Sequence, residues 1–226
     1  MEIQDVGKLI KNLNPVNGCT IGCEYCYARR INNRFKITPD FNVPEFMEKR
    51  LKRIGVKSPQ TYLMTSMSDF SGWKRKWREQ VFQVMKDNPQ HVYLFLTKRP
   101  QLITFDTKMD NVWFGVTVTG RADKDRISCM QDHIKAPNYF ITFEPLFEDM
   151  GHIVLDGIGW VVIGTETGNR KGKITADKSW ILNIAKQAEV KGIPVFMKSS
   201  LVDIVGEENL KQELPASFHT HKNSSS

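Results

Sequence analysis

Short apolar runs alternate with amphipathic stretches along most of this 226-residue chain. The runs are rich in valine, isoleucine, phenylalanine and tyrosine, which predicts strands that are buried on both faces. They lie at Thr61–Thr65, Val92–Thr97, Val112–Val118, Tyr139–Phe143, Trp160–Gly164 and Val195–Lys198. The stretches between them predict helices, most clearly at Trp73–Lys86, Asp123–Ile134 and Lys178–Lys191. A strand followed by a helix, repeated, is the pattern of parallel β/α units.

A further strand at about Leu13–Asn17 brings the number of units to six or seven, fewer than a closed eight-stranded barrel needs. We therefore expect a partial (β/α)6–7 barrel of the TIM type, with an extra helix at Pro44–Ile54. The hydrophobic content of 40% is enough for one sizeable core, which predicts a single domain over residues 1–215. The polar, serine-rich segment 216–226 is expected to be a disordered tail.

Three cysteines fall close together near the N-terminus, in the run Cys19-Thr-Ile-Gly-Cys23-Glu-Tyr-Cys26. Thiolates are soft ligands that select an iron–sulfur cluster or zinc. The fourth cysteine, Cys129, lies far downstream in a predicted helix, and we interpret it as an ordinary half-buried thiol. Three ligands leave one iron of a four-iron cluster open, whereas structural zinc requires four protein ligands. The spacing favours a reactive cluster, with zinc or a structural cluster as the alternatives.

The sequence lacks the features of membrane or secreted proteins. It has no apolar run long enough for a transmembrane helix, and its first residues lack the basic-then-apolar pattern of a secretory signal. We therefore expect a cytoplasmic protein without membrane contacts. In a reducing compartment, clustered cysteines indicate metal ligands rather than disulfides.

The formal net charge of +7 is unevenly distributed, because residues 1–100 carry 18 Lys and Arg against 9 Asp and Glu. These cations cluster near Phe35, Trp73 and Trp77, a combination that could bind a phosphate backbone with aromatic stacking. Solvation and core packing are the alternatives to such binding. Lysine-rich helix faces are commonly just solvated, and tryptophans four residues apart commonly anchor a helix to a sheet. A nucleic acid or a nucleotide is thus one hypothesis for the substrate.

Polar side chains follow the predicted strands at the point where each ends, and in β/α barrels these ends form the active site. Helix capping explains any one of them equally well. Four of the residues, Lys98, Glu144, Glu166 and Lys198, alternate acid and base, which fits a ligand that carries both an ammonium and a carboxylate group. The full set at the strand ends is Ser66, Asp69, Lys98, Thr117, Glu144, Glu166 and Lys198.

The cysteine spacing, with Tyr25 before the last cysteine, resembles the C-x3-C-x-aromatic-C motif of the radical S-adenosylmethionine (SAM) enzymes. Over residues 12–200 the chain resembles small phage-type radical SAM proteins of unknown function from bacteria, archaea and phages. That group is distantly similar to spore photoproduct lyase, a DNA-repair enzyme, and the lysine after the third strand is shared. The matching segments are Asn14-Pro15-Val16-Asn17-Gly18-Cys19, Met67-Ser68-Asp69, Leu96-Thr97-Lys98-Arg99-Pro100, Phe143-Glu144-Pro145-Leu146 and residues 160–168.

Two segments depart from that group. The chain has Gly164-Thr165-Glu166-Thr167-Gly168 where the group often has Gly-Gly-Glu-Ser-Gly. After the last strand it has Ser199-Ser200-Leu201 where the group often has Gln-Trp-Gly. The second departure would border the cavity and therefore bears on the substrate.

The resemblance implies a partial barrel of the radical SAM type in which Cys19, Cys23 and Cys26 hold a [4Fe–4S] cluster. It implies SAM as the second cofactor, cleaved reductively to a 5′-deoxyadenosyl radical that abstracts hydrogen from the substrate. It also implies an electron donor such as flavodoxin or ferredoxin. Acting on a small metabolite is the alternative to a nucleic acid substrate, and a non-catalytic iron–sulfur or zinc sensor or binding protein is the alternative to an enzyme.

The resemblance also implies roles for single residues. Tyr25 would lie near the adenine, Ser66 and Thr117 near the ribose or methionyl part, and Lys98 on the SAM carboxylate. For Cys129, the return of a hydrogen atom to a product radical, as a cysteine does in the lyase, is the alternative to an ordinary core thiol. Asp69, Glu144, Glu166 and Lys198 would make further contacts with SAM or the substrate.

Overall fold

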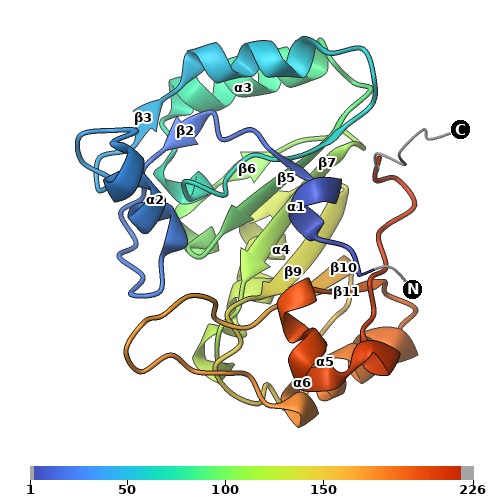
Figure 1. Cartoon of the computed structure of the whole chain (residues 1–226). Coiled ribbons are helices and arrows are strands. Elements are labelled where there is room, and N and C mark those ends of the chain that lie inside the picture. The colour runs from blue at the N-terminus through green and yellow to red at the C-terminus, as the bar shows by residue number, and fades with distance from the viewer. Residues whose placement is uncertain (1–2, 220–226) are drawn as a thin grey trace, which may run out of the picture.

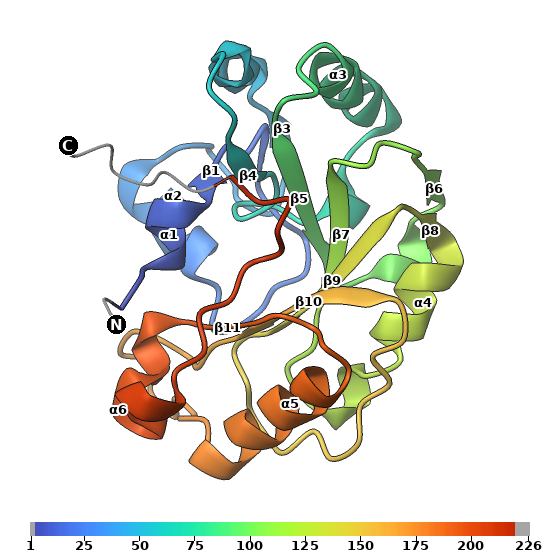
Figure 2. The ribbon, with the colours of Figure 1, turned by 90° about the vertical axis from the view of Figure 1, so that its right-hand side faces the viewer.

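The computed structural model of the chain describes residues 3–219. Its centre is a curled sheet of seven strands, all parallel to their neighbours, in the order β1-β4-β5-β7-β9-β10-β11 (Figures 1 and 2). Because β1 and β11 do not pair with each other, the sheet is a half barrel with two edges. The strands are β1 Lys11–Asn12, β4 Thr61–Leu63, β5 Val92–Thr97, β7 Val112–Thr117, β9 Asn138–Phe143, β10 Ile158–Ile163 and β11 Val195–Met197.

Helices α3, α4 and α5 cover the convex side of this sheet (Figure 2). Each turns an apolar stripe inward, as Val81, Phe82 and Met85 do on α3. These helices are α3 Arg75–Lys86, α4 Arg126–His133 and α5 Lys178–Val190, and shorter ones are α1 Val6–Leu9, α2 Tyr27–Phe35 and α6 Val202–Val205. The alternation in the sequence thus predicted a mixed α/β single domain correctly, and the parallel half barrel is the partial barrel that was expected.

Two small sheets were not predicted. Strand β2, Val16–Asn17, pairs antiparallel with β3, Glu45–Phe46, and β6, Phe105–Asp106, pairs with β8, Ile134–Lys135. The expected first strand at Leu13–Asn17 is therefore wrong. Asn14 adopts a left-handed φ of 54° and breaks the run between β1 and β2.

The expected helix at Pro44–Ile54 is present only in part, as a 3-10 helix that begins at Glu48. Residues 45–46 are drawn into the pairing with β2, and the chain continues as a 3-10 segment, η1 Glu48–Gly55. The remaining 3-10 segments are η2 Phe70–Gly72, η3 Pro100–Leu102, η4 Arg121–Asp123, η5 Ser199–Leu201 and η6 Glu207–Asn209.

Large side chains fill the concave interior toward the N-terminal ends of the strands. Trp113, Phe140, Trp160 and Phe196 belong to one buried cluster there. Gly115 makes room for them, since a Cβ at that position would lie 2.6 Å from the Phe140 ring. Side chains along a strand face one side at every second residue, so Thr117 and Thr142 point the same way as Trp113 and Phe140 but nearer the C-terminal ends. The interior is thus closed at one end and lined by polar groups at the other.

The C-terminal segment crosses from one edge of the sheet to the other (Figure 2). The Met197 amide donates to the Lys211 carbonyl, and the His219 amide donates to the Thr61 hydroxyl, at 2.7 and 2.9 Å. Between these points the Phe218 ring packs edge-on against Trp113 and Trp160. The expected disorder from Ala216 onward is therefore wrong for residues 216–219, because an aromatic anchor holds them; residues 220–226 lie outside the described part of the chain.

No helix within residues 3–219 is long and apolar enough to cross a membrane.

Candidate functional site

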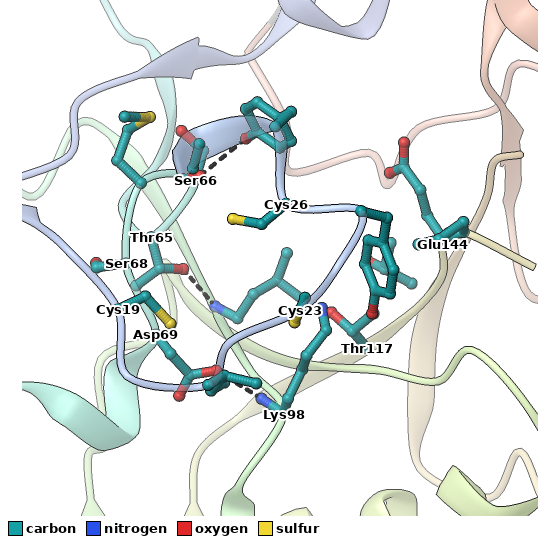
Figure 3. A pocket seen from close by; sticks show the side chains of 18 of the residues that line it. Cys19, Cys23, Cys26, Thr65, Ser66, Ser68, Asp69, Lys98, Thr117 and Glu144 are labelled. Atoms are coloured by element: carbon teal, nitrogen blue, oxygen red, sulfur yellow. Dashed lines mark hydrogen bonds between the residues drawn. The ribbon is translucent and has the colours of Figure 1, made fainter. Parts of the chain in front are cut away.

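A cavity of about 210 Å³ opens at the C-terminal ends of the strands, beside the cysteine loop (Figure 3). Every site residue predicted from the sequence lines it. The three thiols approach from the loop, and the other side chains come from that loop and from the ends of β4, β5, β7, β9, β10 and β11. The predicted set is Cys19, Cys23, Tyr25, Cys26, Ser66, Asp69, Lys98, Thr117, Glu144, Glu166 and Lys198.

Glycine at position 18 allows the cysteine loop to pack closely against the following segment. Its φ is +109°, and a Cβ there would lie 2.9 Å from the Pro44 Cα. Next to it, the Cys19 amide donates to the Phe41 carbonyl at 2.7 Å. The position of the first thiol is therefore set by a backbone contact that a larger residue at 18 would break.

The last cysteine caps helix α2. The Cys26 sulfur accepts from the Arg29 amide at 3.4 Å. Asn32, on the buried face of the helix, accepts a hydrogen bond from Asn17 at 2.9 Å. The helix that begins after the third cysteine of the loop is thus fixed to the strand segment that precedes the first cysteine.

The thiols lie in a largely apolar setting. Ala28, Phe41 and Met67 form a small buried cluster against which Cys19 and Cys26 pack. The pKa of the Cys19 thiol is raised to about 11, mainly by burial; the Ile21 amide opposes the rise, and the nearby Asp69, Cys23 and Cys26 add to it. Any metal group bound here would displace that proton, because only the thiolate is a ligand.

The chemistry of the donor set fits an iron–sulfur cluster. Thiolates are soft ligands of such clusters, and a four-iron cluster binds each thiolate at a different iron. Three soft ligands on one loop, shielded by apolar side chains, suit such a cluster.

Asp69 holds the backbone around Lys98. Its carboxylate accepts from the Thr97 hydroxyl and from the Lys98 amide, both at 2.7 Å, and from the Ser71 amide at 2.9 Å. The Lys98 ammonium lies 5.8 Å from the centre of the Tyr25 ring and has no ion-pair partner among the described residues. Asp69 is therefore occupied in positioning Lys98, whose cationic end extends toward the cysteine loop (Figure 3).

Two other predicted residues are held by neighbours outside the predicted set. The Ser66 hydroxyl donates to the Asn14 side chain at 2.9 Å, which links the end of β4 to the end of β1. The Tyr25 ring packs edge-on against Phe147, 5.2 Å between centroids. Burial is the main reason that the pKa of Tyr25 is raised, so its phenol stays protonated.

The charged groups at the cavity mouth are mostly paired with one another. The Lys198 ammonium donates to Glu144 at 2.6 Å, and the Arg170 guanidinium donates twice to Glu166, at 2.6 and 2.8 Å. Arg170 lowers the pKa of Glu166 through these bonds. The alternating charges predicted from the sequence are thus present, and each of the two glutamates is paired with a cation.

The site also contains residues outside the predicted set. Arg30 and Thr142 line the cavity, and Arg170 pairs with Glu166. Thr142 was detectable, because it lies two residues before Glu144 on the same strand face and pairs in register with Thr117. Arg30 was not detectable in this way, because its position at the cavity depends on how α2 packs beside the cavity.

Cys129 does not line this cavity. It lies on α4, with its sulfur 3.6 Å from Nδ1 of His133. Because α4 is on the convex side of the sheet, this geometry argues against a hydrogen-donating role at the cavity.

Comparison with known proteins gives a family but no activity. No curated protein and no solved structure matches the chain significantly. Residues 8–207, which include the whole half barrel and every residue of the cavity, match the family described as "Protein of unknown function (DUF5131)". The chain belongs to the DUF5131 family.

Proposed function

We propose that this protein is a radical SAM enzyme, with a partial barrel of that type, and that Cys19, Cys23 and Cys26 hold a [4Fe–4S] cluster. The observation that carries the proposal is the meeting of three thiols from one loop with a cationic lysine in a single cavity at the strand ends. A cluster bound there would supply one electron for the reductive cleavage of SAM, whose adenosyl fragment would take a hydrogen atom from the substrate.

The chain's own residues would bind and orient SAM. Lys98, held through its backbone by Asp69, places a cation where the methionyl carboxylate would lie beside the cysteine loop. The Tyr25 ring offers an apolar face for the adenine, and the Ser66 and Thr117 side chains offer hydroxyls to the ribose or methionyl part. Ala28, Phe41 and Met67 keep water away from the thiolates. Glu144 and Lys198, paired on the far side of the cavity, would contact the substrate.

We further propose a nucleic acid or nucleotide as the substrate, supported by the basic surplus in residues 1–100. Reduction would come from a carrier such as flavodoxin or ferredoxin. Three clustered thiols persist in reduced form in the cytoplasm, where we place the protein.

The proposal is tested by anaerobic reconstitution with iron and sulfide, followed by dithionite and SAM. Wild type is expected to form 5′-deoxyadenosine, measured by liquid chromatography. Cys23→Ala is expected to form none, because a ligand is missing. Cys129→Ala is the matched control, since it removes a thiol outside the cavity, and it should behave as wild type. No product from a wild type that carries an intact cluster would reject the enzyme, and bound zinc in place of iron would favour a zinc protein.

A further inference from the structure

Helix α2 exposes an apolar stripe beside the cavity. Tyr27, Ile31 and Phe35 lie four residues apart, so they share one face of the helix, and they are 49%, 37% and 64% exposed. Ala28 and Asn32, each one position further along the helix, lie on the adjoining face, which is the buried one. The Tyr27 hydroxyl donates to the Ser66 carbonyl at 2.9 Å, whereas Ile31 and Phe35 leave apolar surface exposed on this face.

Two arginines lie along this stripe. The guanidinium of Arg34 lies 5.2 Å from the centre of the Phe35 ring. Arg30 lines the cavity, and neither arginine has an ion-pair partner among residues 3–219. Their neighbour Arg29 differs, because it donates to Asn42 and packs over Phe41. Arg30 and Arg34 are thus cations available to a ligand, whereas Arg29 has a structural role.

The space around Arg30 is also kept open. Its guanidinium faces Gly168, where a Cβ would lie 2.9 Å from Nη1 and where φ is +87°. Any side chain at position 168 would crowd the arginine. With Glu144 and Glu166 already paired, Arg30 remains at the mouth as an unpaired cation distinct from Lys98 beside the cysteines.

We propose that a single-stranded nucleic acid lies along α2 and extends one nucleotide into the cavity, a proposal that rests on the function proposed above. Bases would stack on Phe35 and pack on Ile31 and Tyr27, while phosphates would contact Arg34 and Arg30. The nine residues of α2 span about 13 Å, which accommodates about four stacked nucleotides. An acidic electron carrier is the competing occupant. An electron carrier needs only to approach the cysteine loop. A substrate strand must enter the cavity, and Arg30 lines that cavity next to the stripe.

The sequence placed two other aromatics beside basic residues, and the structure rules both out as stacking platforms. Trp73 is 3% exposed and belongs to the core. Trp77 stacks on Phe46, with 6.0 Å between ring centroids. Of the three aromatics named, Phe35 is the most exposed, at 64%, with one ring face next to Arg34, which favours α2 over the basic face of α3.

The test is fluorescence anisotropy with labelled 12-nucleotide single-stranded DNA and RNA, and with a duplex for comparison, on anaerobically reconstituted protein over a range of salt concentrations. Phe35→Ala should weaken single-strand binding about 5- to 150-fold, as loss of a stacked base predicts. Arg34→Gln should reduce the slope of log affinity against log salt by about 0.7, and Arg30→Gln should do the same. Lys76→Gln, an exposed cation on α3, is the control and should leave the affinity unchanged.

Three outcomes would overturn the proposal. The first is that wild type binds neither oligonucleotide at low salt. The second is that the Phe35→Ala and Lys76→Gln proteins bind the single strand with equal affinity. The third is that Phe35→Ala cleaves SAM more slowly than wild type when flavodoxin is the reductant but not when dithionite is. The last would assign the stripe to an electron carrier. Thermal unfolding checks that each variant is folded. Formation of 5′-deoxyadenosine by wild type without any oligonucleotide tests the proposed enzyme activity alone. Failure of that proposal can therefore be distinguished from failure of the proposal that α2 binds a nucleic acid.

Discussion

At the scale of single residues, some side chains of the cavity face its interior, and others hold those side chains in position. Lys98 and the three thiols face the cavity, while Asp69 accepts hydrogen bonds from the chain around Lys98. In the sequence, Lys98 and Asp69 are both polar residues that follow a strand, and only the resemblance gave Lys98 a separate role. Only the folded distances separate the two roles, because Asp69 and Thr97 are far apart in sequence and 2.7 Å apart in space.

Asp69→Asn is expected to weaken SAM binding about tenfold without loss of iron. An amide cannot accept both the Thr97 hydroxyl and the Lys98 amide as the carboxylate does, and such charge-assisted bonds contribute about 1.5–3 kcal/mol. Calorimetry on reconstituted protein measures the affinity, and iron analysis measures the loading. If Asp69 acts through Lys98, the effects of Asp69→Asn and Lys98→Gln will not add. Additive effects, or an equal loss in the exposed control Asp110→Asn, would contradict this role.

At the scale of elements, the strands and helices with strong periodicity were predictable and the short elements were not. Strand β5 has the predicted bounds, and α5 begins at the predicted residue. Elements such as β2 and β3, two residues each, depend on pairing with distant segments, which leaves no periodic signal in the sequence. The cysteine loop is similar, since it depends on Gly18 and on contacts with residues 41–44.

His91 joins η1 to the start of β5, and its protonation should destabilise that junction. Its Nδ1 accepts from the Gln60 amide at 3.1 Å, so in the neutral ring the hydrogen is on Nε2, which donates to the Ile54 carbonyl at 2.8 Å. Burial lowers the pKa of His91, so the ring is neutral in the folded state. Since its pKa is lower folded than unfolded, its contribution is complete above about pH 6.5 and is lost as the pH falls below that value.

His91→Gln should lower the free energy of unfolding by about 1–3 kcal/mol at pH 7.5. It should also reduce the decrease in that free energy between pH 7 and pH 5. Denaturant unfolding at several pH values measures both. The exposed control His152→Gln should keep the pH dependence of wild type. If His91→Gln also keeps it, another group is responsible.

At the scale of the whole molecule, the sequence predicted a partial barrel and the meeting of its strand ends at one cavity. It did not predict how the open interior is closed. The tail composition suggested disorder, yet Phe218 packs on two tryptophans and residues 216–219 reach back to β4. One aromatic residue in a polar segment is a weak signal, and its effect depends on an apolar interior that exists only after folding.

Phe218→Ala should therefore destabilise the protein by about 3–5 kcal/mol, the usual cost of removing a buried aromatic ring. Chemical denaturation monitored by tryptophan fluorescence measures it and also reports on Trp113 and Trp160. Val190→Ala, at a side chain that is 74% exposed, is the control and should change little. A loss for Phe218→Ala as small as that of Val190→Ala would mean that the C-terminal segment does not close the barrel.

The central claim is that three thiolates hold a four-iron cluster with one iron open to SAM. Electron paramagnetic resonance of the anaerobically reconstituted, dithionite-reduced protein tests it without requiring turnover. Wild type is predicted to give the signal of a reduced [4Fe–4S] cluster that changes on addition of SAM, and Cys129→Ala is predicted to give the same change. A signal that SAM leaves unaltered, or one that persists unchanged in Cys23→Ala, would contradict the account.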